Sequence, residues 1–587
     1  MSSISQEEPM ATPSNRDRME NSIDNGHTQG FPNTVRQQPT DRSSMTVPVN
    51  TASETDSTTE AGSNAEADRT ITDGITMEKP QNNGRTLLPD GKKEISRDEA
   101  YHALGFSYPS WKKWTILGVI FIVQVSMNFN ASIYSNGVDA IAAQFSVSQQ
   151  AARVGQMIFL VAYAFGSELW APWSEEFGRW PVLQLSLLFV NTWQIPAALA
   201  PNFGTIVVAR FLGGLSSAGG SVTLGMVADM WEADDQQYAV AFIVFSSVGG
   251  SVVGPIVGGF VQQNLQWRWV FWLQLIFGAA VQAIHFFTVP ETRETILLDK
   301  EARRLRKSGE DPKVYGPNEV KKHRITTKEV LEIWWRPFHM FATEPIVLFL
   351  SLLSGFSDAL IFTFLGSYTP VFKQWGFGPI ELGLAFIPIA IGYFIAYFSF
   401  LPVIRKDMQR RKKNPDSLTP ETRLWWLLYL APLETIGLFG FAWTSFGPPI
   451  PWIAPLLFSA LVGIANYAIY MATIDYMIAA YGPYSASATG GNALARDFLA
   501  GIAALYTAPL YANIGSRPLE NATTVLACLA FVVTIPIYVF YFKGPYFRER
   551  SPFALGLASK RKGHTQREMT SRTNSSVGEK GAKHVED

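Results

Sequence analysis

Six charged residues stand inside long apolar runs of the sequence, where an isolated charge is costly. They are Glu168, Arg210, Asp358, Glu434, Arg496 and Asp497. A charge in a hydrocarbon environment is retained when it is paired or faces a water-filled cavity, so such residues mark functional sites. A carboxylate held there can take up and release a proton, and it can also attract a cationic ligand. Asp358 and Glu434, deep in the second half of the chain, are therefore candidate proton or substrate sites.

The elements that must hold these residues are apolar segments of roughly 20 residues, the length that crosses a hydrocarbon core. Hydropathy and length predict about twelve such spans between Trp114 and Phe542. Their expected limits are 114–135, 152–172, 182–200, 205–228, 239–262, 269–289, 343–365, 382–402, 424–445, 452–474, 486–508 and 523–543. The sequence therefore predicts an all-α polytopic membrane protein with twelve transmembrane helices in two six-helix halves.

Composition divides the chain into five parts. The tail 1–105 is rich in small polar and acidic residues and poor in aromatics, which predicts disorder. The expected parts after it are a first six-helix half (106–289), a polar central linker (290–342), a second half (343–545) and a second polar tail (546–587). Within the linker, "KEARRLRKSGEDPK" (300–313) is typical of a short surface helix.

Most positive charges of the connecting segments lie on one side of the expected membrane, and the other side has only scattered cases such as Arg268, Lys373 and Arg517. Lys112 and Lys113 precede the first span, Arg303 to Lys307 lie in the linker, and Arg405 to Lys413 lie between later spans. Short loops that are rich in Lys and Arg stay in the cytoplasm. Both termini and the linker are therefore expected to be cytoplasmic.

Several classes of function are disfavoured by composition. The formal net charge is −1, which gives no basic footprint for nucleic acid. The single cysteine, Cys528, offers no disulfide, and the seven histidines show no metal-ligand spacing. We expect no metal, no cofactor and no enzymatic nucleophile–base pair.

The stretch "GSELWAPWSEEFGRWP" (166–181) places charges and turn-forming residues between two spans. Gly178 permits a tight reversal, and Glu175 can cap a nearby helix N-terminus. Arg179 can pair with an acidic residue at another helix end, for which Asp229 is the natural partner. The alternative is an ordinary charged turn that only fixes topology.

The fifth span contains "GSVVGPIVGG" (250–259). Gly250, Gly254 and Gly258 recur at four-residue spacing and give a flat face for close helix contact, while Pro255 bends the helix and Gly259 completes the pattern. The alternative is the generic packing of small residues that is common in membrane helices.

Two further motifs contain arginines. "RFLGGLSSAGG" (210–220) begins with Arg210, and "SATGGNALAR" (487–496) ends with Arg496, beside which Asp497 can pair with a neighbour. For Arg210, the alternative to a functional role is a structural arginine bonded to backbone carbonyls.

Together these motifs resemble the major facilitator superfamily, in the variant seen in fungal drug:proton antiporters with twelve spans. The resemblance covers about 106–545. In the first motif Glu175, Gly178 and Arg179 match, whereas the chain departs from the pattern at Ala171, Glu176 and Trp180. The fifth-span motif matches in full. The resemblance implies that Glu175, Arg179 and Asp229 latch the cytoplasmic side in the outward-open state, and that Arg210 takes part in proton coupling.

The resemblance further implies a proton-coupled antiporter that exports drugs, toxic secondary metabolites or polyamines by alternating access. A proton symporter that imports a small nutrient and a transport-dead membrane sensor are the alternatives. We expect a monomer in the plasma membrane, with the vacuolar membrane as the alternative, whose partners are protons, a small-molecule substrate and lipid. Asn130 and Asn521 begin sequons on the outer side and are candidate glycosylation sites.

Overall fold

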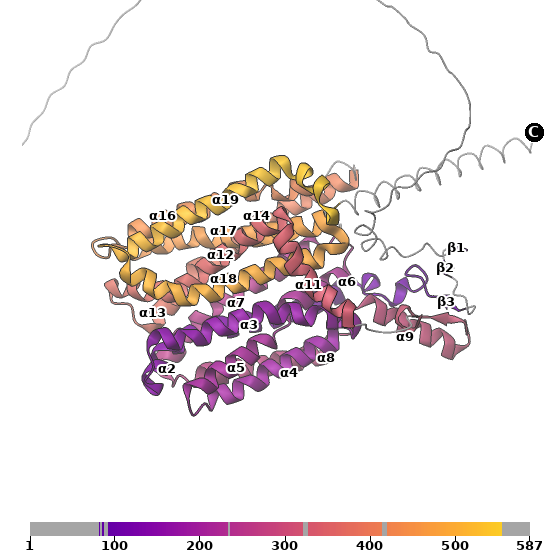
Figure 1. The fold of residues 1–587 in the computed structure, drawn as a ribbon, viewed down its shortest axis with the longest axis horizontal. Helices are drawn as coiled ribbons and strands as arrows, with labels where there is room; N and C mark the ends of the chain where they lie inside the picture. Colours follow the sequence, from indigo (N-terminus) through magenta and orange to yellow (C-terminus); the bar gives the residue numbers. More distant parts are fainter. Residues whose placement is uncertain are drawn as a thin grey trace, which may run out of the picture. The chain divides into compact units, whose positions relative to one another are not determined.

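The computed structural model describes residues 81–82, 85–86, 92–232, 235–320, 327–413 and 419–554. Most of the tail expected at 1–105 and most of the tail expected at 546–587 lie outside the described residues. The described chain is a bundle of long helices, with the first half of the sequence on one side and the second half on the other (Figure 1).

The first half contains six long helical segments, two of which are each made of two α-helices. Their elements are α1 (Ser110–Ser132) with η3 (Ile133–Gly137) and α2 (Val138–Phe145), α3 (Gln149–Glu176), α4 (Arg179–Ala198), α5 (Phe203–Leu215) with α6 (Gly219–Met230), α7 (Gln237–Asn264) and α8 (Trp269–Thr288). The fourth span is therefore interrupted between Leu215 and Gly219. Ser186 on α4 satisfies the freed backbone there, because its hydroxyl donates to the Ser216 carbonyl at 2.7 Å and accepts from the Ala218 amide at 2.9 Å.

The second half repeats this arrangement. Its elements are α12 (Pro345–Phe372) with η4 (Lys373–Trp375), α13 (Pro379–Leu384) with α14 (Ile387–Lys413), η6 (Pro420–Leu424) with α15 (Leu427–Leu430) and α16 (Pro432–Thr444), α17 (Ile453–Tyr481) with η7 (Gly482–Tyr484), α18 (Ser485–Asn513) and α19 (Pro518–Arg550). The last helix thus runs five residues past the boundary expected at 545.

By length and composition alone, ten helical segments of the described chain are apolar enough to cross a membrane. The two other long helices, α4 and α18, are less apolar because they carry buried polar side chains, among them Asn191 on α4 and Arg496 on α18. Both pack within the bundle, α4 against α5 and α8, and α18 against α3 and α12. The prediction of an all-α membrane fold with two six-helix halves is confirmed.

Part of the expected N-terminal tail is folded against the linker. The strand β3 (Lys93–Glu94) pairs in parallel with β4 (Val314–Tyr315) of the linker. Near it, η1 (Tyr101–Ala103) and η2 (Gly105–Ser107) hold Ala100 and Leu104 against Leu297 and Leu298 of α9 (Glu294–Ser308). Within the described chain, folded structure therefore begins before residue 106, because the segment 92–105 buries apolar side chains that a free tail would expose and the short strands β1 (Gln81–Asn82) and β2 (Arg85–Thr86) pair ahead of it.

The linker contains more helix than its sequence predicts. The helix expected at 300–313 runs instead from Glu294 to Ser308 and ends at Gly309, whose φ of 79° stops an α-helix. After it come α10 (Pro317–Val320) and α11 (Thr327–Thr343), and α11 packs on α18 and α3. We call the end of the bundle beside α9 the linker end, and the opposite end, which carries α2 and α13, the distal end (Figure 1).

The halves meet along two lines of contact. One joins α3 to α18, and the other joins α7 to α13, α14 and α17. The second line is closest where Gly259 on α7 meets Gly383 on α13. A Cβ atom on Gly383 would lie 2.6 Å from the Pro255 carbonyl oxygen, and one on Gly259 would lie 2.5 Å from that of Pro379. Only glycines allow this approach of the two backbones.

Candidate functional site

A buried guanidinium lies at the junction of the two halves. The Nε atom of Arg496 on α18 lies 3.6 Å from Oδ2 of Asp358 on α12, and its Nη2 atom lies 3.5 Å from Oδ1 of Asp497. Nη2 also donates to the Ser247 hydroxyl of α7 at 3.1 Å, and the group lies over the Tyr470 ring at 3.9 Å. Three predicted site residues, Asp358, Arg496 and Asp497, are therefore in one cluster that includes a residue from each half.

Glu168 brings a third carboxylate to this cluster from α3. Its side chain is buried and interacts electrostatically with Asp497. A Cβ atom on Gly490 of α18 would lie only 2.5 Å from its Oε2 atom. The sequence leaves Glu168 near the charged turn, whereas the structure places it between the halves. We call Glu168, Asp358, Arg496 and Asp497 the central charge cluster.

Glu434 is buried elsewhere. It lies on α16 and accepts a hydrogen bond from Ser357, whose hydroxyl in turn accepts from the Asn466 amide at 3.1 Å. All three residues belong to the second half. The sequence pairs Glu434 with Asp358 as proton or substrate candidates, but the structure separates them, since Asp358 faces the junction and Glu434 faces the interior of one half.

Arg210 is held by oxygen atoms of the first half. Its Nη1 atom donates to Oδ1 of Asn130 at 2.6 Å and to the Asn130 carbonyl at 3.0 Å, and its Nε atom donates to the Gly155 carbonyl at 3.2 Å. The guanidinium lies 4.0 Å from the centre of the Phe159 ring. No carboxylate among the described residues forms an ion pair with it. This geometry matches the alternative given for Arg210, a structural arginine bonded to backbone carbonyls.

The two expected glycosylation sites differ in their surroundings. Asn130 lies within α1, is 3% exposed and binds Arg210, so its side chain is buried and already engaged in this structure. Asn521 lies in the first turn of α19, exposed, with its amide donating to the Ile514 carbonyl at 3.1 Å. It stays a prediction.

The charged turn at the linker end contains the ion pair that its sequence suggests. The Nε atom of Arg179 lies 2.9 Å from Oδ2 of Asp229, and both side chains are about 7% exposed. Arg293 lies 3.6 Å from the other oxygen of Asp229 and donates to the Glu175 carbonyl at 3.1 Å. All four residues of this turn come before the linker helix α9 in the chain. In this conformation the pair ties α4 to α6 within the first half and does not bridge the halves.

Sequence reasoning missed the role of Glu291 in this turn. Its carboxylate accepts from the backbone amides of Arg179 at 2.9 Å and Trp180 at 3.1 Å, so it caps the N-terminus of α4. Gly178 has a φ of 104°, and a Cβ atom there would collide with the same carboxylate. An acidic residue in "VPETR" (289–293), directly after the sixth span, was the available signal.

The small-residue motif of α7 has two faces. Gly250, Gly254 and Gly258 pack on α1 and η3, where a Cβ atom on Gly250 would lie 2.7 Å from the Asn128 Cβ. Gly259 faces the other half at α13, and Pro255 lies inside the helix between them. The motif therefore holds α7 against its own half on one side and lets the second half approach on the other.

A cavity of about 460 Å³ lies at the linker end and reaches Glu168. Its charged lining residues are Arg97, Glu168, Glu175, Arg179, Asp229, Glu232, Arg293 and Glu294. The three arginines are all in ion pairs, since Arg97 lies 2.8 Å from Glu232 and 3.7 Å from Glu294. Glu168 connects this cavity to the central charge cluster.

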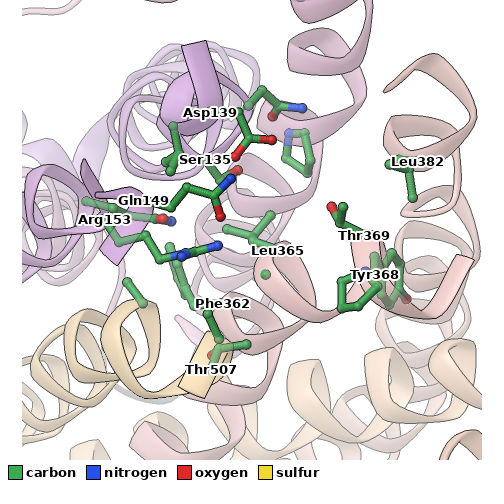
Figure 2. A pocket seen from close by; sticks show the side chains of 18 of the residues that line it. Ser135, Asp139, Gln149, Arg153, Phe362, Leu365, Tyr368, Thr369, Leu382 and Thr507 are labelled. Carbon is green, nitrogen blue, oxygen red and sulfur yellow. The ribbon is translucent and has the colours of Figure 1, made fainter. Parts of the chain in front are cut away.

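A second cavity, of about 340 Å³, lies at the distal end between the halves (Figure 2). Asp139, Gln149 and Arg153 extend into it from the first half, opposite Tyr368 and Thr369 of α12. An apolar layer from both halves separates it from the central charge cluster. This layer consists of Ala131, Phe159, Leu160, Tyr163, Ala359, Phe362, Ala500 and Ala503.

Known sequences agree with this architecture. Residues 120–505 match the family model described as Major Facilitator Superfamily. The chain is 32% identical over 449 residues to the MFS-type transporter kojT of Aspergillus flavus, covering 75% of this chain and 78% of that one. It is 33% identical over 393 residues to the efflux pump atB of Aspergillus terreus, covering 65% and 81%. The citrinin biosynthesis cluster MFS transporter mrr1 of Monascus ruber is 28% identical over 462 residues, covering 77% and 90%.

Solved structures share the fold at low sequence identity. The partially occluded inward-open xylose transporter XylE from E. coli matches with a TM-score of 0.52 and 17% identity, covering 73% of this chain and 98% of that one. The human organic anion transporter MFSD10 matches with a TM-score of 0.50 and 16% identity, covering 73% and 100%. At this identity the likeness concerns the fold alone.

Proposed function

Because the chain belongs to the major facilitator superfamily and its relatives are named transporters, we propose that it is a proton-coupled antiporter that exports small organic compounds. The observation that carries this proposal is the central charge cluster, in which Asp358 and Asp497 share the Arg496 guanidinium at the junction of the halves and Glu168 adds a third carboxylate that interacts with Asp497. The names of two relatives, an efflux pump and a transporter of a biosynthesis cluster, support export of metabolites or drugs.

The charge balance of the cluster supplies the coupling. Arg496 offsets one negative charge of Asp358, Asp497 and Glu168, and unbalanced charge in a low-dielectric site is costly. A proton on one of these carboxylates lowers that cost. Since the cluster joins both halves, its protonation changes how tightly they are held together, which links the proton to the inward–outward equilibrium. A ligand shifts this equilibrium only by its difference in affinity for the two states.

The direction of transport depends on orientation. The linker end is proposed to be cytoplasmic, in keeping with the Lys- and Arg-rich segments around it. The linker-end cavity is then the cytoplasmic entrance, and the distal cavity opens to the outside. We place the protein in the plasma membrane, as a monomer. The latch role of Glu175, Arg179 and Asp229 belongs to the same proposal, as a contact that gains partners when the linker end closes.

Reconstitution into proteoliposomes tests the proposal. An imposed pH gradient should drive substrate flux opposite to proton flux, and reversing the gradient should reverse the direction of substrate movement. Cotransport in the same direction would identify a proton symporter instead. Absence of flux, combined with signalling that is lost when 1–100 are deleted, would identify a sensor.

A matched pair of variants locates the proton site. Asp497→Asn and Glu434→Gln each remove one buried carboxylate of similar size, the first inside the central charge cluster and the second outside it. Asp497→Asn should uncouple flux from the pH gradient, whereas Glu434→Gln should keep the coupling. The reverse result would move the coupling site into the interior of the second half.

The resemblance also assigns Arg210 to proton coupling, and this role is proposed here on that ground. Arg210→Gln should abolish proton-driven efflux while the protein still reaches the membrane. Efflux at the native rate would restrict Arg210 to the structural role that its bonds to Asn130 and Gly155 describe.

A further inference from the structure

We propose that the distal cavity is a binding site for ring compounds that carry carbonyl or carboxylate oxygens and are neutral or anionic. The inference rests on the proposed function, because it names the class of compound that the transporter exports. It is carried by the distal cavity's charge, by a buried amide without a partner and by the rings around it.

The charged groups of the distal cavity favour an anion. Arg153 and Lys373 line it as cations, and Asp139 is the only acidic residue in the lining. No ion pair within 4.0 Å joins any of these three groups to another described residue, although Asp139 attracts Arg153 electrostatically, and the two cations still outnumber this one carboxylate. Figure 2 shows the Arg153 side chain beside Gln149, extending toward the interior of the cavity. A guanidinium with free donors binds a carboxylate in a bidentate manner, so Arg153 is the natural anchor for an acidic ligand.

A second donor lies deeper. Gln156 on α3 lines the cavity, is only 4% exposed, and its Nε2 atom has no hydrogen-bond partner among the described residues. A buried amide without a partner is costly, and a ligand oxygen that accepts from it removes that cost. Arg153 and Gln156 lie three residues apart on α3, so their side chains share one face of the helix.

The remaining lining supplies aromatic surface. Phe362, Tyr368 and Phe386 come from the second half and face these donors across the distal cavity. A volume of about 340 Å³ is at the lower end of the range for small-ligand sites. Donors on one wall and rings on the other suit a compact ring with acceptor oxygens. A polyamine, which brings only donors and positive charge, would meet two cations of the same sign.

The experiment uses three ligands of one shape and different charge. The full-length protein in lipid nanodiscs is titrated, without any pH gradient, with 4-hydroxybenzoate, 4-hydroxybenzamide and 4-hydroxybenzylamine. We expect affinity to fall in that order. Binding is measured at equilibrium, so failure of this inference is distinguishable from failure of proton-driven export, which needs the gradient.

Two variants with matched controls localise the binding. Arg153→Gln should weaken the binding of 4-hydroxybenzoate about tenfold and leave the binding of 4-hydroxybenzamide nearly unchanged, because it removes one charge-assisted contact. Its control is Arg268→Gln, a distal-end arginine outside the lining that lies on the Trp267 ring. Gln156→Leu should weaken the binding of both 4-hydroxybenzoate and 4-hydroxybenzamide about threefold or more. Its control is Gln194→Leu on α4, an equally buried glutamine with one unpartnered amide atom away from the cavity.

The outcomes decide the inference. Preference for 4-hydroxybenzylamine, equal effects of the variants and their controls, or no binding of any of the three compounds would overturn it. Loss of the preference for 4-hydroxybenzoate over 4-hydroxybenzamide in Arg153→Gln, but not in Arg268→Gln, would support it.

Discussion

The two cavities differ in how their charges are satisfied. At the linker end, Arg97, Arg179 and Arg293 are each in an ion pair with Asp229, Glu232 or Glu294. At the distal end, Arg153 and Lys373 have no ion-pair partner among the described residues. Paired charges hold helices and segments of the protein together, whereas charges without partners remain available to a ligand. This difference underlies the proposed roles of the linker end in conformational control and of the distal cavity in ligand binding.

The central charge cluster lies between these regions and shares Glu168 with the linker-end cavity. Glu168 connects it to the linker-end cavity, and the apolar layer around Phe159 and Phe362 separates it from the distal cavity.

The largest effect is expected for Arg496→Gln. It leaves Asp358 and Asp497 buried without their shared cation, which costs about 3 kcal/mol or more and corresponds to about 100-fold in rate if the cost falls on the transport step. Proton-driven flux in proteoliposomes measures this loss. Arg496→Lys keeps the charge and should recover part of the flux. Full activity of Arg496→Gln would show that the cluster is not the coupling site.

The contrast between the cavities predicts unequal stability effects. Asp229→Ala leaves Arg179 and Arg293 without their buried carboxylate and should lower stability by about 3 kcal/mol. Asp139→Ala removes an exposed carboxylate of the distal cavity that forms no ion pair within 4.0 Å among the described residues, and it should change stability by less than about 0.5 kcal/mol. Thermal unfolding of both variants in the same detergent provides the measurement. Equal losses would remove the distinction between the two regions.

A substitution at the closest approach of the halves should shift the conformational equilibrium. A side chain at Gly259 would collide with the backbone of α13, so Gly259→Leu should separate the halves at the distal end. Thiol labelling of a second substitution, Thr507→Cys, in the lining of the distal cavity should become several-fold faster in this background. Gly249→Leu on the same helix has open space around its Cβ position and serves as the control. Unchanged labelling would show that this contact does not close the distal end.

The smallest effect concerns the linker. Arg306 and Arg303 bind Glu319 and lower the pKa of its carboxyl to about 2. Because this folded-state pKa lies below the unfolded value, near 4.5, the ionised Glu319 carboxyl stabilises the linker at pH values above 4.5. This contribution is lost as the pH falls toward 2. Glu319→Gln should therefore increase amide exchange in α9 and α10 at pH 7, and the difference from the native protein should shrink below about pH 4. A difference that persists at pH 2 would contradict this account.

Much of the fold follows from local sequence. Runs of about 20 apolar residues specify the spans, and the glycines of the fifth span specify a helix that packs closely. The pair of Arg179 with Asp229 was also predictable, since both residues lie at adjacent helix ends of one half. Hydropathy did not predict folding of 92–105 against the linker, because the apolar residues that drive it are few and become buried only through contact with α9.

The sequence by itself determined which residues carry charge inside the membrane and which half each belongs to. Only the tertiary structure decided their partners. Asp358 and Glu434 are alike in hydropathy and setting along the chain, yet one faces Arg496 at the junction and the other faces Ser357 within its half. The difference arises because a helix presents residues to its neighbours according to their rotation about its axis. That rotation is fixed by the packing of all the helices together.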